Sequence, residues 1–288
     1  MLNKKVFLAI IALALVSMAC GVTINLPVDQ ITTGPTQTEE INVPAPQADT
    51  VNLTLTFGAG ELNLQPGAEA ALVSGTATYN VTAFKPKIKV EKQQVRLETG
   101  NLDLHGFPNF NTEEIKNKWD FKLGDQTMQL KINAGAYRGD MDLGGLALKS
   151  LEVNDGAADA RLNFSEPNRI EMEMLRYTTG ASNVKLLSLA NANFTSMIFR
   201  SGAGDYSLDF SGELQRDAVV TVESGFSQLI IIVPEGTSAK VLFKGGLTNV
   251  DVSGGWKKSG EAYILGSGGP VITLSLDMAA GNLALRTK

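Results

Sequence analysis

Cysteine and histidine are almost missing from this chain: its 288 residues include one of each, Cys20 and His105. A single cysteine excludes an intramolecular disulfide. A single histidine leaves only acidic residues as partners for a metal ion or for a Ser/His nucleophile. His105 stands in "DLHGFPNF", which is typical of a surface loop. We therefore expect neither a metal site nor a cofactor.

Basic residues are too few for a nucleic-acid protein. The chain has 25 Lys and Arg against 30 Asp and Glu, a net charge of −5, and so lacks the basic stripe that such a protein needs. Aromatic residues make up only 7%, whereas glycine occurs 29 times. Short alternating runs of Val, Leu, Thr and Asn between these glycines are typical of an all-β protein with many turns.

Long apolar runs are also rare, and one stands at the N-terminus. Lys4 and Lys5 precede the 11-residue run "VFLAIIALALV", which is followed by "SMAC". A transmembrane helix needs about 20 apolar residues, so this pattern indicates instead a bacterial secretory signal over residues 1–19. Prolines among Thr, Gln, Glu and Asn then predict an extended, disordered tether over residues 20–50.

Cys20 directly follows the signal. The segment resembles the lipobox of bacterial lipoproteins: Ala19 fits the position before the cysteine, although Ser17 stands where leucine is usual. Cleavage after Ala19 by an ordinary signal peptidase would instead leave Cys20 as an incidental thiol. We predict lipid attachment at Cys20, because an exposed unpaired thiol is otherwise a liability in a secreted protein.

The body of the chain repeats one pattern. With Gly202 as position zero, apolar residues occupy −5 (Met197), −3 (Phe199), +4 (Tyr206) and +6 (Leu208). The same frame, with one exception at Gly139, fits around seven further origins: Gly58, Gly135, Gly156, Gly180, Gly225, Gly246 and Ala279. Each unit predicts a strand, a sharp corner and a second strand, with glycine chosen for a positive φ at the corner.

Two architectures fit this frame. Six consecutive origins, from Gly135 to Gly246, lie 21 to 24 residues apart, which predicts a parallel β-solenoid with one coil per repeat. An antiparallel hairpin meander would give the same alternation. We favour the solenoid because each coil packs on its neighbours, which favours similar residues at equivalent positions of successive coils. The predicted domains are a β capping domain over residues 51–128 and the solenoid over 129–288, with an insertion at 254–270.

Three segments resemble a known family: "DLGGLALKSLEVNDGAADARLNF", "LANANFTSMIFRSGAGDYSLDFSGELQRDAVVTVESGFSQLIIIVPEG" and "GGPVITLSLDMAAGNLALR". They are similar to the bacterial toast-rack envelope domain and to related adhesin-like β-solenoids. The resemblance implies a β-solenoid outside the membrane. It also implies a possible sensor role, because some relatives are the C-terminal parts of Lia-type membrane-stress regulators.

Few residues suggest chemistry. "GAGD" at 202–205 resembles a calcium-binding β-roll repeat with its aspartate out of place, and Asp155, Asp159, Asp205, Asp209 and Asp251 fall at positions expected to face outward. Alternation alone explains such acids, so we expect no enzyme. Trp256, Lys257 and Lys258 in the insertion are a possible partner contact, unless the tryptophan folds onto the end of the solenoid.

These observations predict a lipid-anchored, extracytoplasmic module of the bacterial cell envelope. It would be adhesin-like and would bind an envelope protein or glycan. The alternative is an envelope-stress sensor domain that partners a membrane protein.

Overall fold

The computed structural model describes residues 33–100, 115–266 and 268–288, which belong to one compact unit. The predicted signal, Cys20 and His105 lie outside these ranges. Within them, no helix is long and apolar enough to cross a membrane.

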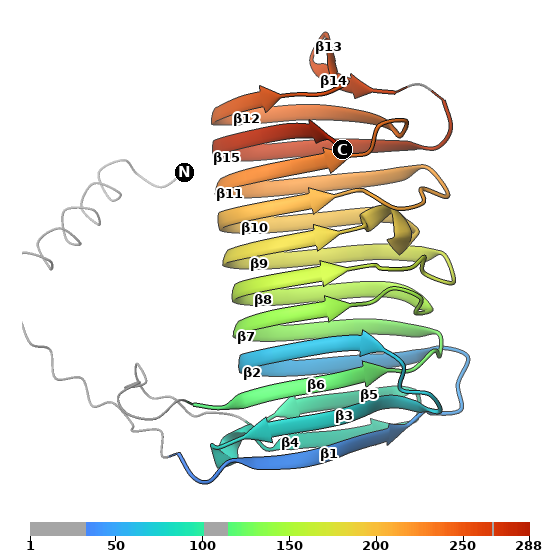
Figure 1. Ribbon diagram of the computed structural model, residues 1–288, viewed down its shortest axis with the longest axis vertical. Coiled ribbons are helices and arrows are strands. Elements are labelled where there is room, and N and C mark those ends of the chain that lie inside the picture. The colour runs from blue at the N-terminus through green and yellow to red at the C-terminus, as the bar shows by residue number, and fades with distance from the viewer. Residues whose placement is uncertain (1–32, 101–114, 267) are drawn as a thin grey trace, which may run out of the picture. The chain divides into compact units, whose positions relative to one another are not determined.

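Eight long strands form a parallel stack (Figure 1). In stacking order they are β2 (Val51–Pro66), β7 (Met128–Asp142), β8 (Leu148–Asn163), β9 (Met172–Leu187), β10 (Phe194–Asp209), β11 (Ala218–Val233), β15 (Val271–Thr287) and β12 (Ser238–Val252). Each bends at the expected corner, so its first arm and second arm contribute to two facing layers. We call each such turn of the chain a level. The parallel pairing confirms the solenoid, and the meander is wrong.

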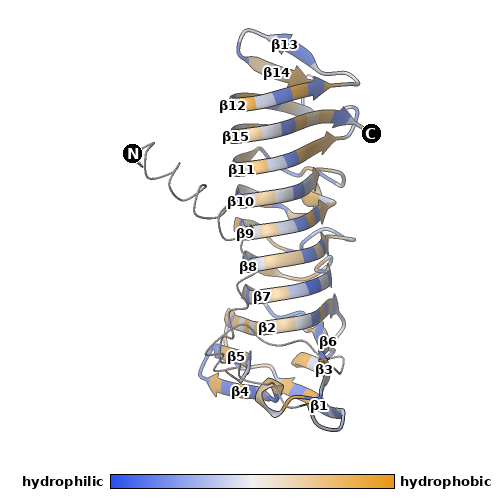
Figure 2. Ribbon diagram, turned by 90° about the vertical axis from the view of Figure 1, so that its left-hand side faces the viewer, coloured by the Kyte–Doolittle hydropathy of each residue, from blue (hydrophilic) through white to orange (hydrophobic). Residues whose placement is uncertain are grey.

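Alternation fills the space between the two layers. In β10, Met197, Phe199, Tyr206 and Leu208 are all buried, as the frame predicts. Leu208 lies beside Leu186 of β9 and Ile231 of β11 in the ladder. Figure 2, which views the stack from its corner edge, shows apolar and polar residues alternating along the strands. The interior is therefore a set of apolar columns that run from level to level.

The corner glycines serve a different purpose from the one expected. Gly202 does not have a positive φ. A Cβ on Gly202 would instead lie 2.7 Å from the carbonyl oxygen of Gly180 in the level before it. Positive φ occurs two residues later, and only in the levels that have glycine there: Gly60, Gly204 and Gly281, with φ of 129°, 144° and 127°. Glycine at these corners thus allows successive levels to approach closely, although the corner of β15 carries Ala279.

The C-terminal strand is inserted into the stack. After β12 the chain forms β13 (Lys257–Ser259) and β14 (Ala262–Leu265), and then returns as β15 between β11 and β12. The consecutive origins Gly225 and Gly246 would make Ile231 and Val252 neighbours at position +6, but Leu285 lies between them and pairs with both. β14 pairs antiparallel with the first arm of β12 at Ala239–Leu242.

The N-terminal end contains one more level, divided between two strands. β5 (Gln94–Thr99) pairs with the first arm of β2, and β6 (Asn117–Leu123) pairs with its second arm. The corner between them is interrupted by an insertion after Gly100, so the sequence frame did not identify this repeat. Trp119 and Phe121 nevertheless occupy the inner positions beside Leu62 and Leu64.

Antiparallel strands end the stack here. β3 (Ala71–Tyr79) pairs with β6, and β4 (Pro86–Glu91) pairs with β5, so this level runs in the opposite direction. β1 (Gln37–Pro44) pairs with β3 at the outer edge. The tether predicted to extend to residue 50 is therefore wrong for β1, because alternate residues Ile41 and Val43 are buried. Two short 3₁₀ turns, η1 (Thr82–Phe84) and η2 (Leu189–Ala192), complete the described elements.

Candidate functional site

The residue that follows each corner points outward, and these residues form a column along the corner edge. In most levels it is alanine, but in β11 it is Phe226 and in β12 it is Leu247. Both lie beside Ala280 of the inserted β15. Phe226 is 71% exposed and Leu247 is 87% exposed. We call Phe226, Ala280 and Leu247 the corner patch.

A groove adjoins this patch. Its volume is about 640 Å³, and it lies between the first arms of β12 and β15 and the β13–β14 hairpin. Lys244 and Lys258 line it with Tyr263 and Asp277. The Lys244 ammonium lies 3.8 Å from the Asp277 carboxylate, and the Lys258 ammonium lies 5.9 Å from the centre of the Tyr263 ring. The groove thus combines aromatic and apolar walls with charges of both signs.

The predicted contact residues are divided by the fold. Trp256 is buried within the apolar core, and its indole N–H donates to the carbonyl oxygen of Arg286 at 3.3 Å. The tryptophan therefore folds onto the C-terminal part of the solenoid, as the alternative interpretation expected, and does not stand free as a contact residue. Lys257 and Lys258 are exposed on β13, and their contact with a partner remains a prediction.

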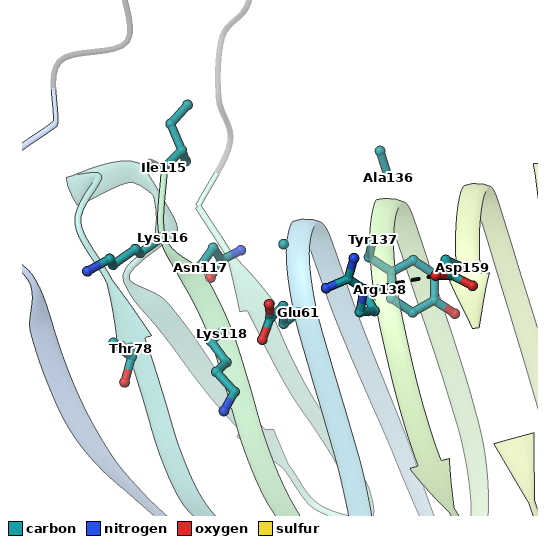
Figure 3. A pocket seen from close by; sticks show the side chains of 11 residues that line it. Glu61, Thr78, Ile115, Lys116, Asn117, Lys118, Ala136, Tyr137, Arg138 and Asp159 are labelled. Atoms are coloured by element: carbon teal, nitrogen blue, oxygen red, sulfur yellow. Dashed lines mark ion pairs between the residues drawn. The ribbon is translucent and has the colours of Figure 1, made fainter. Parts of the chain in front are cut away.

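A second pocket lies near the N-terminal end of the stack (Figure 3). Its volume is about 510 Å³, and β2, β6, β7 and β8 contribute to its lining. Lys118 pairs with Asp120 at 2.9 Å, and Arg138 lies 3.9 Å from Asp159. Exposed pairs of this kind contribute little energy. Lys118 and Arg138 thus face acids at the surface, and neither pair is a desolvated acid–base pair.

One aspartate expected on the surface lies inside the corner. The Asp155 carboxylate accepts hydrogen bonds from the hydroxyls of Tyr177 at 2.7 Å and Tyr137 at 3.4 Å, and from that of Thr179. Burial raises the pKa of Asp155, although these donors oppose the shift. Burial and the nearby carboxylate also raise the pKa of Tyr177. Asp155 stands two residues after the buried Val153, so the alternation of the first arm itself directs it inward, and the expectation that it faces outward was wrong.

Asp155 itself is half-buried, whereas a second aspartate of that set, Asp209, is fully buried and accepts a hydrogen bond from the Ser211 amide at 2.8 Å. Asp159, Asp205 and Asp251 stay exposed, and Asp251 pairs with Arg286 at 2.5 Å. In the part of the chain that the structure describes, no three His, Cys, Asp or Glu side chains gather as metal ligands. The expected acidic face is therefore divided between the interior and the surface.

Two solved structures and one family model resemble this chain. A crystal structure from Clostridium sporogenes, described as a "putative cell adhesion protein", is 19% identical, covers 88% of this chain and all of its own, and has a TM-score of 0.53. One from Parabacteroides distasonis, described as a "putative lipid binding protein", is 13% identical, covers 89% of this chain and 99% of its own, and has a TM-score of 0.44. No curated protein matches the chain. The family model described as the N-terminal domain of toast_rack, DUF2154, matches residues 32–175, half of the chain, and the protein thus belongs to the toast-rack family.

Proposed function

We propose that this protein is a non-enzymatic, adhesin-like binding module of the bacterial envelope, held on the membrane by a lipid on Cys20. The corner patch carries the proposal. Phe226 and Leu247 place two large apolar side chains in solvent on a column that elsewhere carries alanine. Neither side chain contributes to the interior, and exposed large apolar groups of this kind mark interaction sites.

The surroundings of the patch support binding. The groove lies next to it, because Lys244 and Leu247 flank the same corner of β12. Lys257 and Lys258 on β13 add positive charge at this end of the stack. The Clostridium sporogenes protein, which shares the fold, is described in terms of cell adhesion, and we extend that role to this chain.

The distribution of acids supports a role without catalysis. Asp155 is half-buried and Asp209 is buried, and both are hydrogen-bonded within the fold. Asp159 and Asp251 are paired with arginines at the surface. General acid–base catalysis needs carboxylates that converge on a shared site with displaced pKa values. These four acids instead pair with basic side chains or accept hydrogen bonds within the fold.

The test uses the full-length tagged protein in a bacterial host. Membranes are cross-linked and solubilised, and the components that co-purify with wild type are identified. The double variant Phe226→Ser/Leu247→Ser should lose at least one envelope component that wild type retains. Val219→Ser is the matched control, because Val219 is an apolar residue of β11 that is 55% exposed but lies away from the corner patch.

Equal recovery with the double variant, wild type and the control would overturn the proposal, provided that all three unfold at the same denaturant concentration. An integral membrane protein as the lost component would favour the stress-sensor alternative over adhesion.

A further inference from the structure

The last level of the stack is only half covered. β14 pairs with the first arm of β12 at Ala239–Leu242. No strand in the described ranges pairs with the second arm, 247–252, on the side away from β15. Val250 and Val252 are consequently only half-buried, whereas Leu283 and Leu285 at the same positions of β15 are fully buried. We call this open edge beside β14 the terminal notch.

The backbone of the notch offers free hydrogen-bonding groups. The Ser253 amide donates to the carbonyl oxygen of Leu285 in β15 at 3.0 Å. In a parallel ladder, alternate residues direct their amide and carbonyl groups to opposite neighbours. Thr248, Val250 and Val252 therefore present theirs to the notch.

The usual protection of a sheet edge is weak here. Edge strands are normally blocked by charges, proline or bulges. At the opposite end of the sheet, β1 carries Glu39, Glu40 and Pro44. In the second arm of β12 the one charged residue is Asp251, and it pairs with Arg286 of β15. The notch is thus an open edge of alternating apolar residues.

We propose that the terminal notch binds an extended polypeptide segment of the partner by strand addition. This rests on the proposed function and specifies how the partner is held. The segment would pair with Thr248–Val252 and place alternate apolar side chains over Val250 and Val252. Its end would reach Leu247, so the corner patch and the notch form one continuous binding surface.

The size of the notch favours a single strand over a second copy of the chain. If two copies paired through their second arms, the two β12 strands would lie about 4.8 Å apart. Their first arms, however, are each covered by a β14 strand, so two β14 strands would have to fit into a gap that is wide enough for none. One added strand instead lies level with β14 and completes the last level.

A random eight-residue peptide library displayed on phage is the probe, selected against the full-length protein. Enriched peptides should alternate apolar and polar residues and lack central proline. Val250→Pro should weaken their binding at least 10-fold, because it removes an amide that faces the notch and breaks no bond to β15. Val250→Ala, which also shortens the side chain but keeps the amide, should bind within about 3-fold of wild type.

Amide hydrogen exchange of the peptide complex shows where on the protein the peptide binds. The amides of Thr248, Val250 and Val252 should exchange at least 10-fold more slowly with peptide than without it. If Val250→Pro lowers the denaturation midpoint, Thr248→Pro against Thr248→Ala repeats the comparison at a second amide that faces the notch.

Three results would overturn strand addition: no enriched peptide, equal binding by the proline and alanine variants, or concentration-dependent self-association that protects β12 amides without peptide. The proposed function fails separately. A partner that is lost with Phe226→Ser/Leu247→Ser but retained by Val250→Pro would support the proposed binding module and show that the notch does not hold the partner.

Discussion

The carbonyl oxygen of Gly180 occupies the space in which a side chain on Gly202 would begin. A Cβ built on Gly202 lies 2.7 Å from that oxygen, closer than such atoms approach in folded proteins. The same contact joins Gly225 to Gly202, at 2.5 Å. The corner edge is thus a column of close backbone contacts, and those at Gly202 and Gly225 depend on the absence of a side chain, whereas β15 has Ala279 at the equivalent position.

Gly202→Ala should therefore destabilise the protein by about 1–3 kcal/mol, as overpacking does elsewhere. Ala203→Ser is the matched control: it also adds one heavy atom, but at an exposed position, and should change the free energy of unfolding by no more than about 0.5 kcal/mol. Denaturant titration of both variants measures the difference. Equal effects would show that the corner tolerates a side chain.

Leu208→Ala should cost about 2–5 kcal/mol, because Leu208 is fully buried between Leu186 and Ile231 and its removal leaves a cavity. Ser207→Ala, on the outer face of the same arm, should stay within about 0.5 kcal/mol of wild type. Equilibrium unfolding in urea gives both values. Small and similar changes at the two positions would contradict the alternation between interior and surface.

Asp155 should make stability depend on pH in an unusual direction. Burial raises the pKa of this carboxyl, so the folded state holds the proton more tightly than the unfolded chain. Below the unfolded pKa, about 3.9, both states are protonated and no penalty exists. As pH rises through the folded pKa, the partly buried carboxylate must ionise, and stability falls.

Asp155→Asn removes that ionisation. The free energy of unfolding of the variant minus that of wild type should therefore be larger at pH 7 than at pH 3.5, so that the variant gains stability relative to wild type as the pH rises. Chemical denaturation at the two pH values tests it. A difference that stays constant, or that moves in favour of wild type at pH 7, would contradict the prediction and show that the donors Tyr177 and Thr179 outweigh burial.

Cys20→Ala should release the protein from the membrane, because the 11-residue apolar run before Cys20 is too short to serve as a stable span. Cell fractionation with immunodetection measures the release, and wild type grown with a labelled fatty acid should incorporate the label. Full retention of the variant in membranes, with no label in wild type, would contradict the predicted lipid attachment at Cys20.

Much of the interior could be predicted from the sequence. The frame around Gly202 identifies Met197, Phe199, Tyr206 and Leu208 as core residues because the period of two along a strand does not depend on which strand lies beside it. Repetition of that frame at intervals of 21–24 residues also predicts the parallel stack. The exposed pair Phe226 and Leu247 could have been found in the same way, since both stand where other repeats have alanine.

The position of each level was decided by tertiary structure. β15 lies between β11 and β12, and β5 with β6 completes a level across an interrupted corner. Every level carries the same apolar pattern, so the pattern does not predict which two levels are neighbours. The order of the levels depends on which sheet edge is still open when the chain returns to the stack. Trp256 is buried for a similar reason, because the surface that it covers exists only once the levels are assembled. The inward direction of Asp155, by contrast, follows from the period of two, because Asp155 lies two residues after the buried Val153. The sequence by itself therefore determined what each level buries, and the assembled stack determined their order and the edge that remains open at β12.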